Sequence, residues 1–238
     1  MKPFLILETG TPIPRLRRHG SFGHWIRVAA GLHGRQVRQV WVADGEPLPD
    51  AGDYAGVLVT GSGAMVTERA DWSERSADWL RDAAEAGRPL FGICYGHQLI
   101  AHALGGSVGY NPRGREMGTV PVQLREAAAS DPLFAGLPAR IDAQTTHLQT
   151  VLAPPPKAQV LAHSERDDCQ AFRWGESVWG VQFHPEFSTG MMRGYIQARS
   201  GALKDEGTCH HGLLRTVKPA PLARRVLRRF IHLAHRRA

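Results

Sequence analysis

The sequence predicts an α/β fold with a mostly parallel central sheet, helices on both faces, and a smaller antiparallel sheet. Before Gly105, short apolar runs alternate with segments whose apolar residues recur at helical spacing, and this alternation is typical of parallel sheets. After Gly106 the sequence changes to short alternating runs, which favour antiparallel strands with one face in solvent. The chain has 238 residues, of which 42% are apolar, and is long enough to bury one large core.

Four apolar runs in the first part predict buried strands, because each is rich in branched residues and ends at turn residues. In chain order they cover residues 4–7, 37–42, 54–60 and 90–93. Helical spacing between them predicts helices over residues 22–29 and 72–86, and a third helix directly after residue 94. Strand and helix alternate here as they do in βαβ units.

The second part predicts four further strands and then helices. The strands cover residues 119–124, 159–163, 170–174 and 177–183. Pro185 follows the last of them and ends its ladder, since proline has no N–H to donate. The helices are expected at about 190–206, at 212–217 and at 221–237.

The net charge of +7 is unevenly distributed, because eight lysine and arginine residues follow Glu206, the last acidic residue. Six of them share the final helix with Leu222, Val226, Leu227, Phe230 and Leu233, which we expect to face inward. A solvated helix face explains this charge better than a nucleic-acid groove does, so no nucleic-acid partner is expected. We predict a single domain over residues 1–238, with a basic helical extension over about residues 190–238.

Three cysteines, Cys94, Cys169 and Cys209, form no paired framework, which fits a reducing compartment. No stretch is long and apolar enough to span a membrane, and the first residues are too soon interrupted for a signal peptide. We therefore expect a cytoplasmic protein with no membrane partner. We also expect neither metal nor cofactor, because residues 209–211 lack distant ligand partners and no glycine-rich phosphate loop is present.

Cys94 lies where an apolar run stops and a helical pattern begins, with Gly92 and Gly96 on either side. A tight strand-to-helix turn needs such small neighbours, because its backbone adopts dihedral angles that a Cβ resists. The turn also brings the thiol close to the positive end of the following helix, which favours the thiolate. This arrangement predicts a nucleophile elbow with cysteine in place of serine.

A thiol nucleophile needs a base, and the base needs a group that orients it. His184 and Glu186 can form that pair, because residues two apart in an extended segment point to the same side. Taken alone, a histidine and a glutamate at a strand end are more often ordinary surface residues. The remaining motifs reverse this preference.

Residues 92–98 and 182–186, Gly-Ile-Cys-Tyr-Gly-His-Gln and Gln-Phe-His-Pro-Glu, resemble the two signature segments of the class I glutamine amidotransferases, the cysteine-triad family. Residues 60–63 are similar to the oxyanion loop of that family, and residues 111–118 to the segment that follows its nucleophile helix. Among its members, the chain most resembles the amidotransferase domain of GMP synthase and the free-standing γ-glutamyl peptidases. The resemblance implies a flavodoxin-like sheet of the amidotransferase type.

The resemblance also implies the catalytic roles. Cys94 would attack a γ-glutamyl amide, His184 would act as base and then as acid, and Glu186 would hold the imidazole. Backbone N–H groups of the Gly61 and Ser62 turn and of Tyr95 would form the oxyanion hole.

Substrate binding is implied at Gln98 and at a second segment, which comprises Thr146, His147 and Leu148. The family has an aspartate where this chain has Gln149. A neutral amide cannot form an ion pair with the α-ammonium of the substrate, so this contact is expected to differ.

Three hypotheses for function follow. The first is a stand-alone enzyme that hydrolyses glutamine through a cysteine thioester and supplies ammonia to a separate synthetase. The second is a γ-glutamyl peptidase or hydrolase that acts on a larger γ-glutamyl compound. The third, a binding protein without turnover, is disfavoured because Cys94, His184 and Glu186 are all present.

Overall fold

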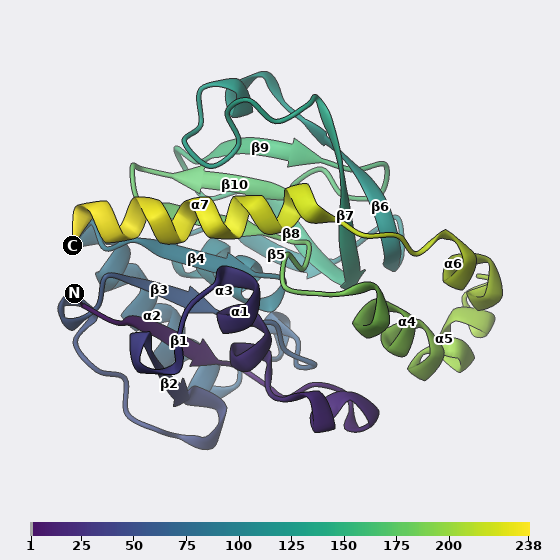
Figure 1. Cartoon of the computed structure of the whole chain (residues 1–238), viewed down its shortest axis with the longest axis horizontal. Coiled ribbons are helices and arrows are strands. Elements are labelled where there is room, and N and C mark those ends of the chain that lie inside the picture. Colours follow the sequence, from purple (N-terminus) through teal and green to yellow (C-terminus); the bar gives the residue numbers. More distant parts are fainter. Residues whose placement is uncertain (1) are drawn as a thin grey trace.

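A nine-stranded mixed sheet runs through the structure, a computed structural model that describes residues 2–238 (Figure 1). The strands in spatial order are β2 (Val37–Trp41), β1 (Phe4–Glu8), β3 (Gly56–Val59), β4 (Leu90–Ile93), β11 (Val178–Val181), β10 (Ala171–Trp174), β9 (Gln159–His163), β6 (Glu116–Leu124) and β7 (Arg140–His147). Neighbours from β2 to β11 pair in parallel. Neighbours from β11 to β7 pair antiparallel.

The predicted fold class is confirmed, with one difference in how the antiparallel part is built. The runs expected to be antiparallel continue the large sheet, and the separate small sheet comprises β5 (Ser107–Tyr110) and β8 (Gln149–Ala153). β11 joins the two halves, because it pairs in parallel with β4 and antiparallel with β10.

Helices cover both faces of the parallel half. α2 (Asp71–Glu85) and α3 (Tyr95–Ala103) pack on the face that carries Leu5 and Leu7. α1 (Phe22–Ala30) and α7 (Pro221–Arg237) pack on the opposite face, which carries Phe4 and Ile6. The alternation along β1 follows from the two-residue period of a strand. Both faces are buried, as a parallel sheet requires.

The final helix, α7, belongs to the core and does not project from it. Figure 1 shows it lying across the sheet, and Phe230 on its inner face is fully buried. Two of its arginines bind backbone carbonyls: Arg228 donates to Ala29, and Arg229 donates to Leu133 and Ala135. The expected inward positions are therefore correct, and part of the basic charge is anchored on the protein itself.

Three short helices lie near the carboxyl ends of the parallel strands, at one end of the molecule in Figure 1. They are α4 (Thr189–Ala198), α5 (Ser200–Asp205) and α6 (His210–Thr216). The single helix expected at about 190–206 is thus two helices, and Arg199 is the residue between them. Within residues 2–238, no helix combines the length and the apolar character needed to cross a membrane.

Candidate active site

Cys94 lies at the corner between β4 and α3 in a strained backbone conformation. Its φ is 53° and its ψ is −102°, outside the regions that a non-glycine residue favours. Such a conformation costs about 1–3 kcal/mol and persists only where the surroundings enforce it. Here the N–H of Cys94 donates to the Val181 carbonyl at 2.8 Å, and its carbonyl accepts from Gln98 N–H at 3.1 Å.

The two glycines beside Cys94 are required by close backbone approach. A Cβ on Gly92 would clash with the backbone of Gly96, and a Cβ on Gly96 would clash with Val59 of the neighbouring strand. The N–H of Gly96 donates to the Thr60 carbonyl at 3.1 Å. The turn predicted from residue size alone is therefore present, and its tightness comes from contact with β3.

His184 and Glu186 follow β11, the neighbour of β4, so they reach the same edge of the sheet as Cys94. His184 Nδ1 and Glu186 Oε1 are 2.7 Å apart, and both residues are buried. The imidazole also stacks on Phe187, with ring centroids 4.1 Å apart. Within residues 2–238, His184 Nε2 has no hydrogen-bond partner, which leaves this atom free for proton exchange.

The thiol and the imidazole shift each other's pKa toward an ion pair. Burial is the largest single effect on the pKa of Cys94 and would raise it, but the charges of His184 and His147 act together in the opposite direction, and the pKa is lowered. Burial alone would lower the pKa of His184, but the charges of Glu186 and Cys94 raise it to about 10. A thiolate beside an imidazolium is the reactive state of a cysteine nucleophile.

The Gly61–Ser62 turn lies directly beside this pair. A Cβ on Gly61 would be 3.0 Å from His184 Cε1 and 3.8 Å from Cys94 Cβ. Ser62 Oγ donates to the Thr9 carbonyl at 2.7 Å and accepts from Ala64 N–H at 3.1 Å. Tyr95 follows Cys94, and its hydroxyl is 2.7 Å from Ser73 Oγ. Both backbone segments expected to form an oxyanion hole are therefore held firmly next to the thiol.

The residues expected to bind substrate line a pocket next to Cys94. Gln98, Thr146, His147, Leu148 and Gln149 all contribute to its wall. Gln98 Nε2 donates to the Gln149 carbonyl at 2.7 Å. Gln149 Nε2 donates to Thr67 Oγ1 at 2.5 Å, whereas Gln149 Oε1 and Thr146 Oγ1 have no partner among the described residues. Two unsatisfied polar oxygens thus belong to residues of this wall.

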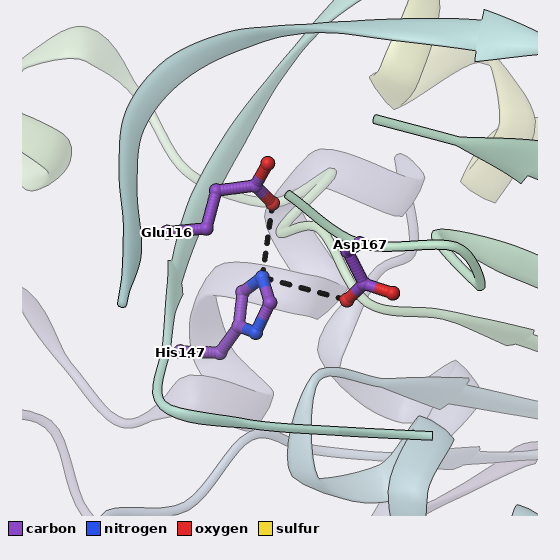
Figure 2. A group of neighbouring side chains, drawn as sticks. All are labelled: Glu116, His147 and Asp167. Carbon is purple, nitrogen blue, oxygen red and sulfur yellow. Dashed lines mark hydrogen bonds and ion pairs between the residues drawn. The ribbon is translucent and has the colours of Figure 1, made fainter. Parts of the chain in front are cut away.

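A buried cluster of Glu116, His147 and Asp167 supports this segment (Figure 2). His147 Nδ1 is 2.9 Å from the Gln149 carbonyl, which can only accept, so Nδ1 carries a proton. Nε2 is 3.0 Å from Glu116 Oε2 and 3.7 Å from Asp167 Oδ2. Burial opposes a charge on His147, but these two carboxylates raise its pKa. The hydrogen bonds and the raised pKa both favour the charged form of His147.

The cluster also has the composition of a metal site, since one ligand atom from each residue lies within 4.8 Å of the others. However, the carboxylate oxygens of the cluster already accept hydrogen bonds from other groups of the protein. Glu116 accepts from Ser164 Oγ and Gln170 Nε2, and Asp167 accepts from Thr150 Oγ1 and Cys169 N–H. The cluster is thus a hydrogen-bonded group of charged side chains that fixes the segment expected to bind substrate.

Comparison with known proteins identifies the family. Residues 18–200 match the sequence profile described as Glutamine amidotransferase class-I. The chain belongs to the class-I glutamine amidotransferase family. It is 39% identical over 169 residues to a glutamine-hydrolysing GMP synthase of Aeropyrum pernix, covering 66% of this chain and 30% of that protein. The chain thus spans less than a third of the length of that relative.

Two further relatives are matched over a larger share of their own length than the GMP synthase of Aeropyrum pernix. A subunit of the glutamine-hydrolysing GMP synthase of Ignicoccus hospitalis is 35% identical over 141 residues, covering 59% of this chain and 71% of that protein. γ-Glutamyl peptidase 4 of Arabidopsis thaliana is 28% identical over 193 residues, covering 79% and 76%. A solved glutamine amidotransferase from Methylobacillus flagellatus shares the fold, with a TM-score of 0.79, 24% identity, and coverage of 98% and 95%. These relatives are named as enzymes.

Two arginines in the site of this amidotransferase were not identified from the sequence. Arg115 and Arg199 both contribute to the pocket next to Cys94. Arg115 lies inside one of the motif segments, so its position could have indicated a role. Arg199 lies within a stretch whose spacing predicts one continuous helix, and no feature of the sequence indicates that this arginine lies in the site.

Proposed function

We propose that this protein hydrolyses the γ-glutamyl amide of glutamine through a thioester on Cys94. The observation that carries the proposal is the coupled group at the strand edge. The thiol of Cys94 has a lowered pKa because of the His184 charge, and His184 Nδ1 is 2.7 Å from Glu186 Oε1. A thiolate activated by an imidazolium that a carboxylate orients is suited to acyl transfer.

In the proposed reaction, the Cys94 thiolate attacks the γ-carbonyl carbon, and a sulfur–carbon bond forms. Backbone N–H groups of the Gly61–Ser62 turn and of Tyr95 donate to the oxygen that becomes negative. The loss of one such donor typically costs about 2.7–4 kcal/mol in the barrier. His184 Nε2, which has no partner within residues 2–238, gives its proton to the departing nitrogen. Water then hydrolyses the thioester and releases glutamate.

Substrate binding in this proposal uses the pocket walls. Gln98, Thr146, His147 and Leu148 contact the glutamyl group. Gln149 Oε1, an unpartnered buried oxygen among the described residues, accepts a hydrogen bond from the α-ammonium where the family has an aspartate. This contact is weaker than an ion pair, so we expect the α-ammonium group of the substrate to be bound weakly.

The proposal includes a separate synthetase as the acceptor of ammonia, supported by the similarity to a relative named as a subunit of GMP synthase. We also propose that the chain forms one catalytic domain. A reducing, cytoplasmic setting would keep the active thiol unoxidised.

A second candidate function is hydrolysis of larger γ-glutamyl compounds. A further pocket, on the His184 side of Cys94, favours it. Thr11, Ile13 and Phe22 contribute to its wall, and ammonia would leave this space unused. The similarity to a γ-glutamyl peptidase over 79% of the chain supports the same alternative.

Assays of ammonia and glutamate release test the proposal. Purified protein is incubated with glutamine, with and without cell extract, and separately with γ-glutamyl peptides. Ammonia released from glutamine supports the first function, and release of amine from peptides only supports the second. Unchanged hydrolysis in Cys94→Ser would contradict both, because each requires the thiol as nucleophile.

A further inference from the structure

The two pockets that adjoin Cys94 have basic side chains in their walls. Their walls include the guanidinium groups of Arg115 and Arg199 and the imidazoles of His147 and His184. Among the described residues, neither wall includes an aspartate or a glutamate. Glutamine carries one positive and one negative charge, so it gains little from such a surface. A substrate with an additional negative charge gains more.

The two arginines differ in how well they are neutralised. Arg115 makes three hydrogen bonds to the Glu206 carboxylate, with distances of 2.9–3.1 Å. Arg199 makes no hydrogen bond or ion pair with side chains of residues 2–238, and its Nε is buried without a partner. Burial and the charge of Arg115 lower the pKa of Arg199, but a guanidinium stays charged at neutral pH. Arg199 is thus an unsatisfied cation, a state that a bound anion would relieve.

The backbone holds Arg199 in a defined place. Its N–H donates to the Tyr195 carbonyl at 3.1 Å, and its carbonyl accepts from Leu203 N–H at 2.9 Å. Both Tyr195 and Leu203 are buried in one apolar cluster. The break between α4 and α5 therefore fixes the start of this side chain beside the site.

Arg199 borders both pockets and is the only basic residue common to the two walls among residues 2–238. One pocket contains Gln98 and Gln149, which fit the glutamyl part of a substrate. The other contains His184, the proposed proton donor to the leaving amine, and extends to Ile13 and Phe22. The leaving amine therefore departs into the pocket that holds His184 and Arg199.

We propose that Arg199 binds a carboxylate on the leaving amine, so that the preferred substrates are γ-glutamyl conjugates of amino acids or peptides. The inference rests on the proposed thioester mechanism, and it favours the second candidate function over hydrolysis of glutamine as the preferred reaction. The Cys94 sulfur–carbon bond forms first, and the amide C–N bond then breaks as the negative charge on the oxygen returns to the carbonyl. His184 gives its proton to the nitrogen, and Arg199 holds the carboxylate of the amino acid that leaves. Water then releases glutamate from Cys94.

The test compares γ-glutamylglycine, whose leaving amine bears a carboxylate, with γ-glutamylmethylamide, whose leaving amine does not. The readout is the ratio of kcat/KM for the two compounds. In Arg199→Gln this ratio is expected to fall about 10-fold to 100-fold, as for the loss of a hydrogen-bonded charge pair. Lys204→Gln is the matched control, because it removes an exposed positive charge from α5 without touching either pocket, and its ratio is expected to equal that of wild type.

Calorimetric titration of both compounds into Cys94→Ala gives a second readout that does not depend on turnover. Binding of γ-glutamylglycine is expected to be weaker in the double variant that carries both Cys94→Ala and Arg199→Gln. An unchanged ratio and unchanged binding in the Arg199 variant would overturn the inference. An equal fall in kcat/KM for both compounds would also overturn it, because Arg199 would then bind the α-carboxylate of the glutamyl group, which both compounds share.

If wild type hydrolyses the methylamide without preferring γ-glutamylglycine, the substrate class fails and the thioester mechanism stands. If neither compound acylates Cys94, the mechanism itself fails.

Discussion

Removing the charge of Glu186 is expected to lower the pKa of His184, so that the Cys94–His184 ion pair is lost at a lower pH. In Glu186→Gln the amide keeps the shape of the side chain but cannot stabilise an imidazolium. The lost hydrogen bond joins two buried groups 2.7 Å apart. A hydrogen bond to a charged group contributes about 1.5–3 kcal/mol, which corresponds to about 1–2 pKa units. The pKa of His184 should fall by this amount from its value of about 10.

The expected shift concerns the pH at which the ion pair is lost. Cys94 loses its proton while His184 is still charged, because the pKa of the thiol is lowered and that of the imidazole is raised. The rate at which Cys94 reacts with iodoacetamide should change again where His184 loses its proton, and this alkaline step should move downward by about 1–2 pH units in Glu186→Gln. Alkylation is followed by mass spectrometry of the Cys94 peptide between about pH 5 and about pH 11, a range that includes the pKa of a free thiol.

A matched control is available in a second carboxylate–imidazole pair. Glu74 lies 3.2 Å from His102 on the α2 and α3 side, and Glu74→Gln should leave the Cys94 profile unchanged. The experiment uses a Cys209→Ser background, since Cys209 is an exposed free thiol. Identical pH profiles for wild type and Glu186→Gln would refute the role of Glu186 in holding the charged imidazole.

Three further predictions concern stability, each measured by chemical denaturation. Gly92→Ala should destabilise the fold by at least about 1–3 kcal/mol, because its Cβ would clash with the Gly96 backbone, whereas Gly63→Ala, with open space around it, should not. His147→Leu should cost about 3–5 kcal/mol, since it leaves two buried carboxylates without their cation. Phe230→Ala in α7 should cost about 3–5 kcal/mol, because the ring is fully buried. Near-wild-type stability in Gly92→Ala, His147→Leu or Phe230→Ala would contradict the packing or ion pairing from which its destabilisation is predicted.

The sequence predicted best those elements whose pattern is local. β4 and α7 have the expected bounds, because an apolar run between turn residues and a long amphipathic repeat each carry their own signal. The Cys94 corner was predicted for the same reason, since the glycines that permit it are adjacent in the chain. His184 and Glu186 also meet as expected, but they do so in a turn after β11 and not in the extended segment from which their pairing was predicted.

Features that depend on distant residues were not predicted. β7 was missed because its only buried apolar residues are Ile141 and Ala143, whereas Gln144 and Thr145 are polar although fully buried, so no apolar run reveals the strand. The cluster around His147 joins Glu116 to Asp167, which are remote in sequence. Arg199 lies at a helix break that tertiary packing determines, and its missing partner becomes visible only when its neighbours in space are known.

The central claim is that Cys94 carries a γ-glutamyl thioester during turnover. Wild type is mixed with a γ-glutamyl compound, quenched in acid within the first turnovers, and digested for mass spectrometry of its three cysteines. The account predicts a glutamyl adduct on Cys94, none on Cys169 or Cys209, and no adduct in Cys94→Ser. Turnover of the compound with Cys94 unmodified, or with full activity in Cys94→Ser, would contradict it.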